Sequence, residues 1–269
     1  MGKIEEFLAG CPKSEAPDKK KMPWQSFQAF PGFMVNRMYI LVSRPKLAIR
    51  AFGDEDYLQP LSFFLFFTFI LTFLQNLANN LQLAVAFTFS QPAYTQPGIS
   101  DVLSLFFSFS ASSLQFITWP LERTIYSFLF LGISVIILAL GLWLITGIIS
   151  WNPAFTIGAY CLPVPMLLFT ILAFVQVPGM IPAAFSERIG LAFFLAGIIF
   201  TIVIAGYGIR ALTKTPKITA IIMALFWTLI GTLAIAGAQE FIIYPLGSGL
   251  RQMILRAFFP SSFPTVVGS

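Results

Sequence analysis

Long apolar runs fill most of this chain after Pro60, and a proline, a charge or a cluster of polar residues bounds each of them. A helix of roughly 20 apolar residues crosses the hydrocarbon core of a bilayer, where the backbone must satisfy its hydrogen bonds internally. Only 10% of the residues are charged, against about 25% in a typical soluble domain. The chain is therefore predicted to be an all-α polytopic membrane protein with a bundle of five transmembrane helices.

The boundaries of the runs divide residues 59–246 into a five-span membrane domain. Asn152 and Thr215, each followed by a proline, have the form of helix N-caps, and Ser186 is a further predicted cap. The predicted spans are residues 61–80, 124–150, 153–176, 187–210 and 216–244, and an external C-terminal tail follows at residues 247–269.

Residues 1–58 are predicted to form a cytoplasmic tail, partly disordered, with an amphipathic helix on the inner membrane surface over about residues 33–52. Apolar residues recur there at helical spacing among basic ones, and Pro45 is expected to interrupt the helix. The apolar residues are Met34, Met38, Leu41, Leu47, Ile49 and Phe52, and the basic ones are Arg37, Arg44, Lys46 and Arg50. Residues 91–119, rich in Ser and Phe, are predicted to form an outer interfacial or re-entrant helix.

The Lys and Arg residues indicate the orientation of the chain. With the tail inside, twelve of the 16 lie on the cytoplasmic side and four, at positions 123, 188, 251 and 256, lie outside. Cytoplasmic loops carry the excess of Lys and Arg, so the N-terminus is predicted to be cytoplasmic and, with five spans, the C-terminus external. The net charge of +5 therefore reports orientation and affinity for membrane lipids rather than nucleic-acid binding.

The residue types exclude several kinds of chemistry. The chain has no histidine and two cysteines, which leaves out a histidine-based catalytic triad and a histidine–cysteine zinc site. Cys11 lies in the tail and Cys161 in the third span, so the two are not expected to pair. No nucleophile and base stand at a readable spacing, and we expect neither an enzyme nor a bound cofactor or metal.

Two prolines inside the third span form the first candidate site. Pro163 and Pro165 each remove an amide donor and free the carbonyls of Ala159 and Cys161 about four residues back, with Tyr160 between them. One interpretation is a broken helix that lines a solute or ion path. The other, which we favour, is a kink whose carbonyls are met by a side chain or a neighbouring helix.

Charged residues near the outer ends of spans two, four and five form the second candidate site, an outer polar layer. They are Glu122, Arg123, Glu187, Arg188 and Glu240. Glu240 is expected to pair with Arg123 or Arg188, and a proton or cation site is the alternative. Gln75, Asn76, Asn79 and Asn80 share this level. These amides either line a polar vestibule or, as we favour, simply end the first span.

The stretch Ile157 to Pro163, Ile-Gly-Ala-Tyr-Cys-Leu-Pro, resembles the third-span signature of the Yip family, five-span membrane proteins named for interaction with Ypt and Rab GTPases. Tyr39 to Phe67 and Gly206 to Ala220 are similar to the membrane entry and the fourth loop of bacterial members. Eukaryotic members carry Asp-Leu-Tyr-Gly-Pro before the first span, where this chain has Asp-Tyr-Leu-Gln-Pro at residues 56–60. The resemblance is therefore to bacterial members, and it implies a protein of the inner membrane.

Two functions remain open. The first is a non-enzymatic membrane protein of the Yip type, a scaffold or membrane-organising, trafficking-like factor whose partners are membrane lipids and a protein bound by the cytoplasmic tail. The second is a small-solute or ion transporter or channel that uses the kinked third span and the outer polar layer. Small residues at four-residue spacing, such as Ala192 and Ala196, allow close helix packing within one chain or in a homo-oligomer.

Overall fold

A computed structural model describes residues 23–52, 57–90, 99–112, 115–177, 183–238 and 244–258. Every regular element among these residues is a helix. The helices are α2 (Pro23–Ser43), α3 (Pro45–Phe52), α4 (Leu58–Ser90), α5 (Ile99–Ser112), α6 (Gln115–Thr146), α7 (Trp151–Cys161), α8 (Pro163–Val175), α9 (Ala183–Thr213), α10 (Lys217–Ala238) and α11 (Tyr244–Phe258). The prediction of an all-α fold is confirmed for the part of the chain that is described.

Four segments are long and apolar enough to cross a membrane: Leu58–Thr88, Thr118–Thr146, Trp151–Val175 and Arg188–Thr213. They match the first four predicted spans and make the chain an integral membrane protein. The predicted fifth span falls on α10, whose apolar stretch Lys217–Leu233 is shorter than these four within the described residues. The count of five spans therefore stays a prediction.

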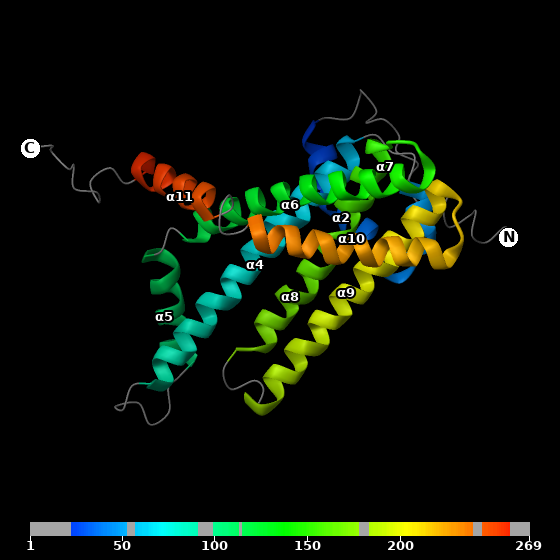
Figure 1. The fold of residues 1–269 in the computed structure, drawn as a ribbon. Coiled ribbons are helices and arrows are strands. Elements are labelled where there is room, and N and C mark those ends of the chain that lie inside the picture. Colours follow the sequence, from blue (N-terminus) through cyan, green and yellow to red (C-terminus); the bar gives the residue numbers. More distant parts are fainter. Residues whose placement is uncertain are drawn as a thin grey trace, which may run out of the picture.

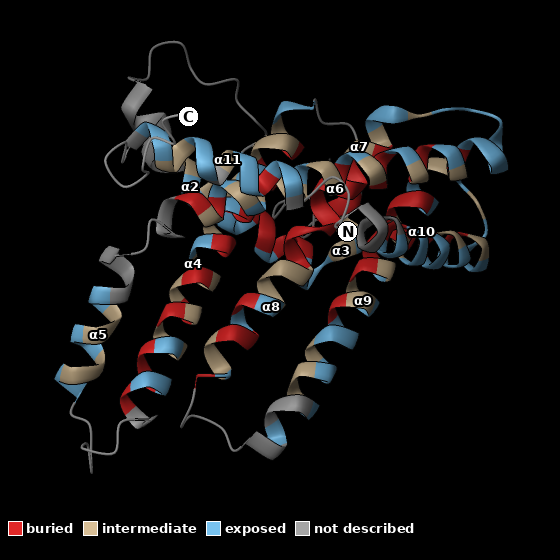
Figure 2. Cartoon of the chain, turned by 60° about the vertical axis from the view of Figure 1, so that its left-hand side comes forward, coloured by how far each residue is buried: buried red, intermediate tan, exposed pale blue. Residues whose placement is uncertain are grey.

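The helices form two layers rather than one parallel bundle (Figure 1). The helices α4, α8 and α9 lie side by side, with α5 next to α4, while α6 and α10 run across them. Figure 2 shows buried residues gathered where α4, α8 and α9 meet the crossing helices. The candidate site described below is a cavity lined by residues from both layers.

Close approach of helices at the crossing depends on glycine. A Cβ atom built on Gly158 of α7 would lie 3.0 Å from Cδ1 of Leu131 in α6. One built on Gly208 of α9 would lie 2.7 Å from Cγ1 of Ile157 in α7. Small residues let the backbones of membrane helices approach closely. This matters because lipid tails are as apolar as the side chains, so helix association depends on close van der Waals packing. Both glycines belong to the stretches that carry the Yip resemblance.

Several predicted boundaries were wrong by a few residues. The second predicted span began at residue 124 and ended at 150, whereas α6 begins at Gln115, contains Pro120 and ends at Thr146. Membrane helices tolerate proline because neighbouring groups satisfy the freed backbone. Gly147, with φ of 70°, ends the helix in the left-handed conformation that glycine adopts readily.

The two predicted caps of the third and fourth spans were also misplaced. The N-cap of α7 is Ser150 rather than Asn152, and it makes no side-chain capping bond. Ser186 lies inside α9, which begins at Ala183. In both cases the helix begins at an apolar residue that precedes the predicted cap, Trp151 in α7 and Ala183 in α9. The capping residue alone therefore did not locate the start of the helix. The α10 helix does begin directly after Pro216, at Lys217.

The N-terminal helix is broken where expected, since α2 ends at Ser43 and α3 begins at Pro45. Met34, Met38 and Leu41 lie in α2, as their helical spacing predicted, but they are buried within the protein. Arg37 was interpreted as part of a basic face on the membrane surface, and this is wrong, because only 6% of the side chain is exposed. Residues 1–22 lie outside the described part of the chain.

The predicted segment 91–119 contains the helix α5, and its last residues, from Gln115, are the first turn of α6. The α5 helix packs along α4 (Figure 1). Residues 91–98 lie outside the described part of the chain. The interfacial or re-entrant position of this helix stays a prediction.

Candidate functional site

The third span divides at the two prolines. The helices α7 and α8 meet at Leu162, which keeps helical dihedrals of −67° and −40° and donates its N–H to the carbonyl of Gly158 at 3.2 Å. Pro163 is the first residue of α8, a position at which the missing N–H costs little. The interruption falls inside the predicted Tyr160–Pro165 stretch. That the freed carbonyls are met by an adjacent span stays a prediction.

Tyr160 and Cys161 are fully buried and serve packing. The guanidinium of Arg37 donates one hydrogen bond to the Tyr160 hydroxyl and a second, at 2.7 Å, to Oε1 of Gln59. The same guanidinium lies 4.6 Å from the ring centre of Phe33. The Cys161 sulfur lies 4.0 Å from the carbonyl of Thr201 in α9. The motif tyrosine thus anchors α2 to α7 through a buried cation, a contact that sequence reasoning missed because the partners are 123 residues apart.

A cavity of about 500 Å³ lies between α4, α6, α8, α9 and α10. We call it the bundle cavity. Its walls are mostly apolar, and Leu162 and Pro165 place the proline interruption of the third span on its surface. The other apolar walls include Phe130, Met166, Phe169 and Phe194. The cavity has the size of small-ligand sites, which span about 300–1,000 Å³.

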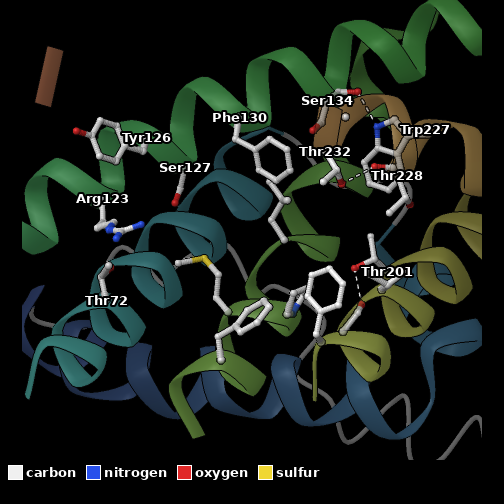
Figure 3. Close-up of a pocket in the computed structure, with 18 of the residues that line it drawn as sticks. Thr72, Arg123, Tyr126, Ser127, Phe130, Ser134, Thr201, Trp227, Thr228 and Thr232 are labelled. Carbon is white, nitrogen blue, oxygen red and sulfur yellow. Dashed lines mark hydrogen bonds between the residues drawn. The ribbon is translucent and has the colours of Figure 1, made fainter. Parts of the chain in front are cut away.

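Polar side chains stand at two ends of the bundle cavity (Figure 3). Arg123, Tyr126, Ser127 and Thr72 gather at one end, and Ser134, Thr201, Trp227, Thr228 and Thr232 at the other. At the second end the Trp227 indole donates to the carbonyl of Ser134 at 2.8 Å, and Thr228 donates to the carbonyl of Ala224 at 2.8 Å. These donors are therefore satisfied by the backbone. Arg123 is the one charged residue among the described residues that line the bundle cavity.

A second, smaller pocket of about 300 Å³ adjoins the charged end. We call it the asparagine pocket, and it is lined by Asn76, Asn79, Asn80, Leu83, Thr118, Trp119 and Glu122. Asn76, Asn80 and Thr118 are each at least 97% buried. The Asn80 amide nitrogen is buried with no hydrogen-bond partner among the described residues. Leaving such a donor unsatisfied costs roughly 1–3 kcal/mol, which indicates a site for a polar group.

The two pockets meet at Glu122 and Arg123. Consecutive helix residues point about 100° apart, so the Arg123 side chain lines the bundle cavity and the Glu122 side chain lines the asparagine pocket. Tyr126 joins the two, because it lines the cavity and donates its hydroxyl to Oε1 of Glu122 at 3.1 Å. The Arg123 guanidinium lies 5.2 Å from the ring centre of Trp119. A positive and a negative group thus stand beside each other at the mouth of an apolar cavity.

Of the predicted outer polar layer, the structure describes the side chains of Glu122, Arg123 and Arg188. Arg123 lines the bundle cavity together with Gln75. Glu122 lines the asparagine pocket together with Asn76, Asn79 and Asn80. Arg188 is exposed near the start of α9 and lines neither pocket. The Glu187 side chain and all of Glu240 lie outside the described residues, so the expected pairing of Glu240 stays a prediction.

The hydroxyl-lined end of the cavity was not predicted. Ser134, Thr201 and Thr228 come from three different helices, and no local pattern reports which helix faces meet. Among the described residues no group of three or more His, Cys, Asp or Glu side chains could hold a metal ion. The donors present suit a polar or charged organic group at the mouth and an apolar chain inside.

Comparison of the chain with protein families, curated proteins and solved structures found no match. The fold and the site define it as a helical integral membrane protein with a mostly apolar cavity between its helices and a charged mouth.

Proposed function

We propose that this chain is a non-enzymatic, Yip-type protein of a bacterial inner membrane that organises the membrane by binding a phospholipid. One acyl chain occupies the bundle cavity, and the zwitterionic head group lies at its charged mouth. The observation that carries the proposal is the placement of Arg123 and Glu122, on adjoining faces of α6, at the junction of an apolar cavity and a pocket of amides.

The cavity suits an acyl chain better than a polar solute. Phe130, Met166, Phe169 and Phe194 supply apolar walls. At the far end the hydroxyls of Thr201, Thr228 and Thr232 and the Trp227 indole donate to backbone carbonyls. A volume of about 500 Å³ holds part of a lipid rather than a whole one. The rest of the molecule stays in the bilayer that surrounds the exposed apolar faces of α6, α9 and α10.

The mouth suits a phosphoethanolamine group. Arg123 supplies the donor fork that matches a phosphate. Glu122 and the amide oxygens of the asparagine pocket accept hydrogen bonds from a primary ammonium, and the Asn80 amide nitrogen donates to a phosphate or ester oxygen. A choline group carries no N–H and cannot use these acceptors. Phosphatidylethanolamine is therefore the preferred lipid.

Photo-crosslinking tests the proposal. The purified protein in nanodiscs is exposed to phosphatidylethanolamine with a photoactivatable acyl chain, and the labelled residues are mapped by mass spectrometry. We expect labelling of Met166 or Phe169, reduced about tenfold in Arg123→Gln, because a charge-assisted hydrogen bond is lost. Arg188→Gln, which removes an exposed arginine outside both pockets, is the control. Equal labelling by phosphatidylcholine, or labelling confined to outer helix faces, would contradict the proposal.

A small-solute or ion path is the second candidate. It is favoured by the contact of the bundle cavity with Leu162 and Pro165, where the third span is interrupted. Proteoliposomes loaded with a potential-sensitive dye test it. Ion flux that scales with folded protein and is lost in Gly231→Leu, which fills the cavity, would support this candidate over lipid binding.

A further inference from the structure

A third pocket, away from the bundle cavity, gathers positive charge. It has a volume of about 270 Å³ and is lined by Lys46, Tyr207, Arg210, Ala211 and Lys214. We call it the basic pocket. Lys46 comes from the first turn of α3, Tyr207 and Arg210 from the last turns of α9, and Lys214 directly follows α9. The helices α3 and α9 pack against each other, so the three cations converge through the fold rather than through sequence proximity.

Among the residues that the structure describes, no acidic side chain lines the basic pocket. Lys46, Arg210 and Lys214 are all exposed to solvent, and like charges that line one small pocket attract an anion to it. Arg210 and Lys214 alone have an ordinary explanation, because cations near a helix C-terminus interact favourably with the helix dipole. Lys46 is not part of that helix and has no such explanation. Its arrival at the pocket points to a shared anionic ligand.

The backbone of Lys214 gives a second, independent observation. Its φ is 54°, in the left-handed region, and among the described residues it is the one non-glycine residue with positive φ. Its N–H donates to the carbonyl of Arg210 at 3.1 Å, which closes the end of α9. Glycine is the usual residue at this position of a helix end, because a Cβ is disfavoured there. A lysine in a strained position beside two other cations indicates that its side chain is needed.

We infer that the basic pocket binds a phosphate group. Two lysines and one arginine among the lining residues supply positive charge, and Tyr207, which also lines the pocket, carries a hydroxyl that can donate a hydrogen bond. The phosphate can belong to an anionic lipid head group or to a soluble phosphate compound. The inference is independent of the bundle cavity, because the two sites share no lining residue.

The variant Lys214→Gly tests the role of the Lys214 side chain separately from the positive φ of its backbone. Glycine relieves the strained φ, so the variant is expected to unfold at the same temperature as wild type or higher, and at the same time it removes one cation. Phosphate binding is measured as thermal stabilisation of the purified full chain. One arm uses phosphatidic acid in phosphatidylcholine nanodiscs, and the other uses inorganic pyrophosphate with phosphatidylcholine alone.

We expect about tenfold weaker binding in Lys214→Gly and in Lys46→Gln, and a change of less than twofold in Lys217→Gln. Lys217 is an exposed lysine three residues further on that does not line the pocket. Stabilisation by phosphatidic acid alone assigns the phosphate to a lipid, and stabilisation by pyrophosphate assigns it to a soluble compound. Failure of both probes to stabilise wild type, or equal binding in Lys214→Gly, would overturn the inference.

Discussion

Arg37 and Tyr160 illustrate how single residues fix this fold. A buried arginine is costly unless its donors are met. Here the two terminal nitrogens of Arg37 donate to the Tyr160 hydroxyl and to Gln59, and the ring of Phe33 lies close by. Phe63 packs on the Tyr160 ring at 4.8 Å between centres. The pair therefore connects α2, α4 and α7 at one point.

Tyr160→Phe keeps the ring and removes the acceptor of the Arg37 hydrogen bond. We expect a loss of roughly 1.5–3 kcal/mol in the free energy of unfolding, the range for hydrogen bonds to charged groups. Denaturant unfolding in detergent micelles measures it. Tyr39→Phe, in the same α2 contact region but 65% exposed, is the control and should change little. Equal stability of the two variants would show that the Arg37 contact contributes nothing.

The sequence allowed some residues of the site to be predicted and not others. Glu122, Arg123 and the amides from Gln75 to Asn80 were visible because polar residues near the end of an apolar run are unusual. The division of these residues between two pockets could not be predicted, because it depends on the direction in which each side chain leaves its helix. The burial of Arg37 was missed for a related reason. A basic residue in an amphipathic stretch normally lies at the surface, and its partner Tyr160 is distant in sequence.

At the scale of elements, glycines set the distances between helices. Gly208 of α9 faces Ile157 of α7, which is fully buried and branched at Cβ, so it cannot move aside easily. Gly32 of α2, by contrast, has no heavy atom within 4 Å of an added Cβ. The same substitution should therefore have opposite effects at the two positions.

Gly208→Ala is expected to destabilise the protein by about 1–3 kcal/mol through overpacking. Gly32→Ala is expected to stabilise it by about 0.5–1 kcal/mol, because alanine favours a helix. Unfolding in detergent measures both variants. The double variant Gly208→Ala with Ile157→Ala should lose less stability than the sum of the two single losses, since the two changes share one contact. Additive losses in the double variant would rule out a direct clash.

The α11 helix packs over α6 beside the charged mouth. Gly247 of α11 is the contact point, because a Cβ there would overlap the Tyr126 hydroxyl and lie 2.7 Å from Cγ of Glu122. Gly249, on the same helix, has no atom within 4 Å of an added Cβ.

Gly247→Ala should separate α11 from α6 and break the Tyr126–Glu122 hydrogen bond. We expect faster amide hydrogen exchange across residues 244–258 and a local loss of about 1–3 kcal/mol. Gly249→Ala should leave exchange unchanged or slower. If Gly247→Ala exchanged as slowly as wild type, the packing of α11 on Tyr126 would be refuted.

Helix ends show where local signals fail. The proline at position 45 and the proline at 216 marked helix starts correctly, because no competing apolar pattern ran through them. Pro120 and Ser186 lie inside helices, because apolar residues on both sides continue the helical pattern. The crossing of α6 and α10 over the other helices could not be predicted, since periodicity reports which face is apolar but not the angle at which it packs.

At the scale of the whole molecule, topology depends on whether α10 crosses the membrane. The excess of Lys and Arg predicts that residues 1–60 and the turn at Lys214 are cytoplasmic. With α10 as a fifth span the C-terminal helix α11 lies outside, and without it α11 lies inside.

Cysteine labelling of intact cells tests this topology in a background without Cys11 and Cys161. An impermeant maleimide should label Arg188→Cys and Gly249→Cys from outside, and Lys214→Cys only after permeabilisation. Labelling of Lys214→Cys in intact cells would reverse the orientation. Protection of Gly249→Cys in intact cells, with Arg188→Cys still labelled, would show four spans instead of five.

The central claim is that a phospholipid occupies the bundle cavity, and native mass spectrometry of the protein extracted from its membrane tests it most directly. Gly231 lines the cavity, and an added Cβ would meet only Oγ of Ser134, at 3.8 Å, so Gly231→Leu places its side chain in the cavity without a backbone clash. Gly132→Leu, at an exposed glycine of α6 with no atom within 4 Å, is the matched control. We predict that wild type and Gly132→Leu retain phosphatidylethanolamine and that Gly231→Leu loses it while still folded. Retention of the same lipid by folded Gly231→Leu, or its absence from wild type, would contradict the claim.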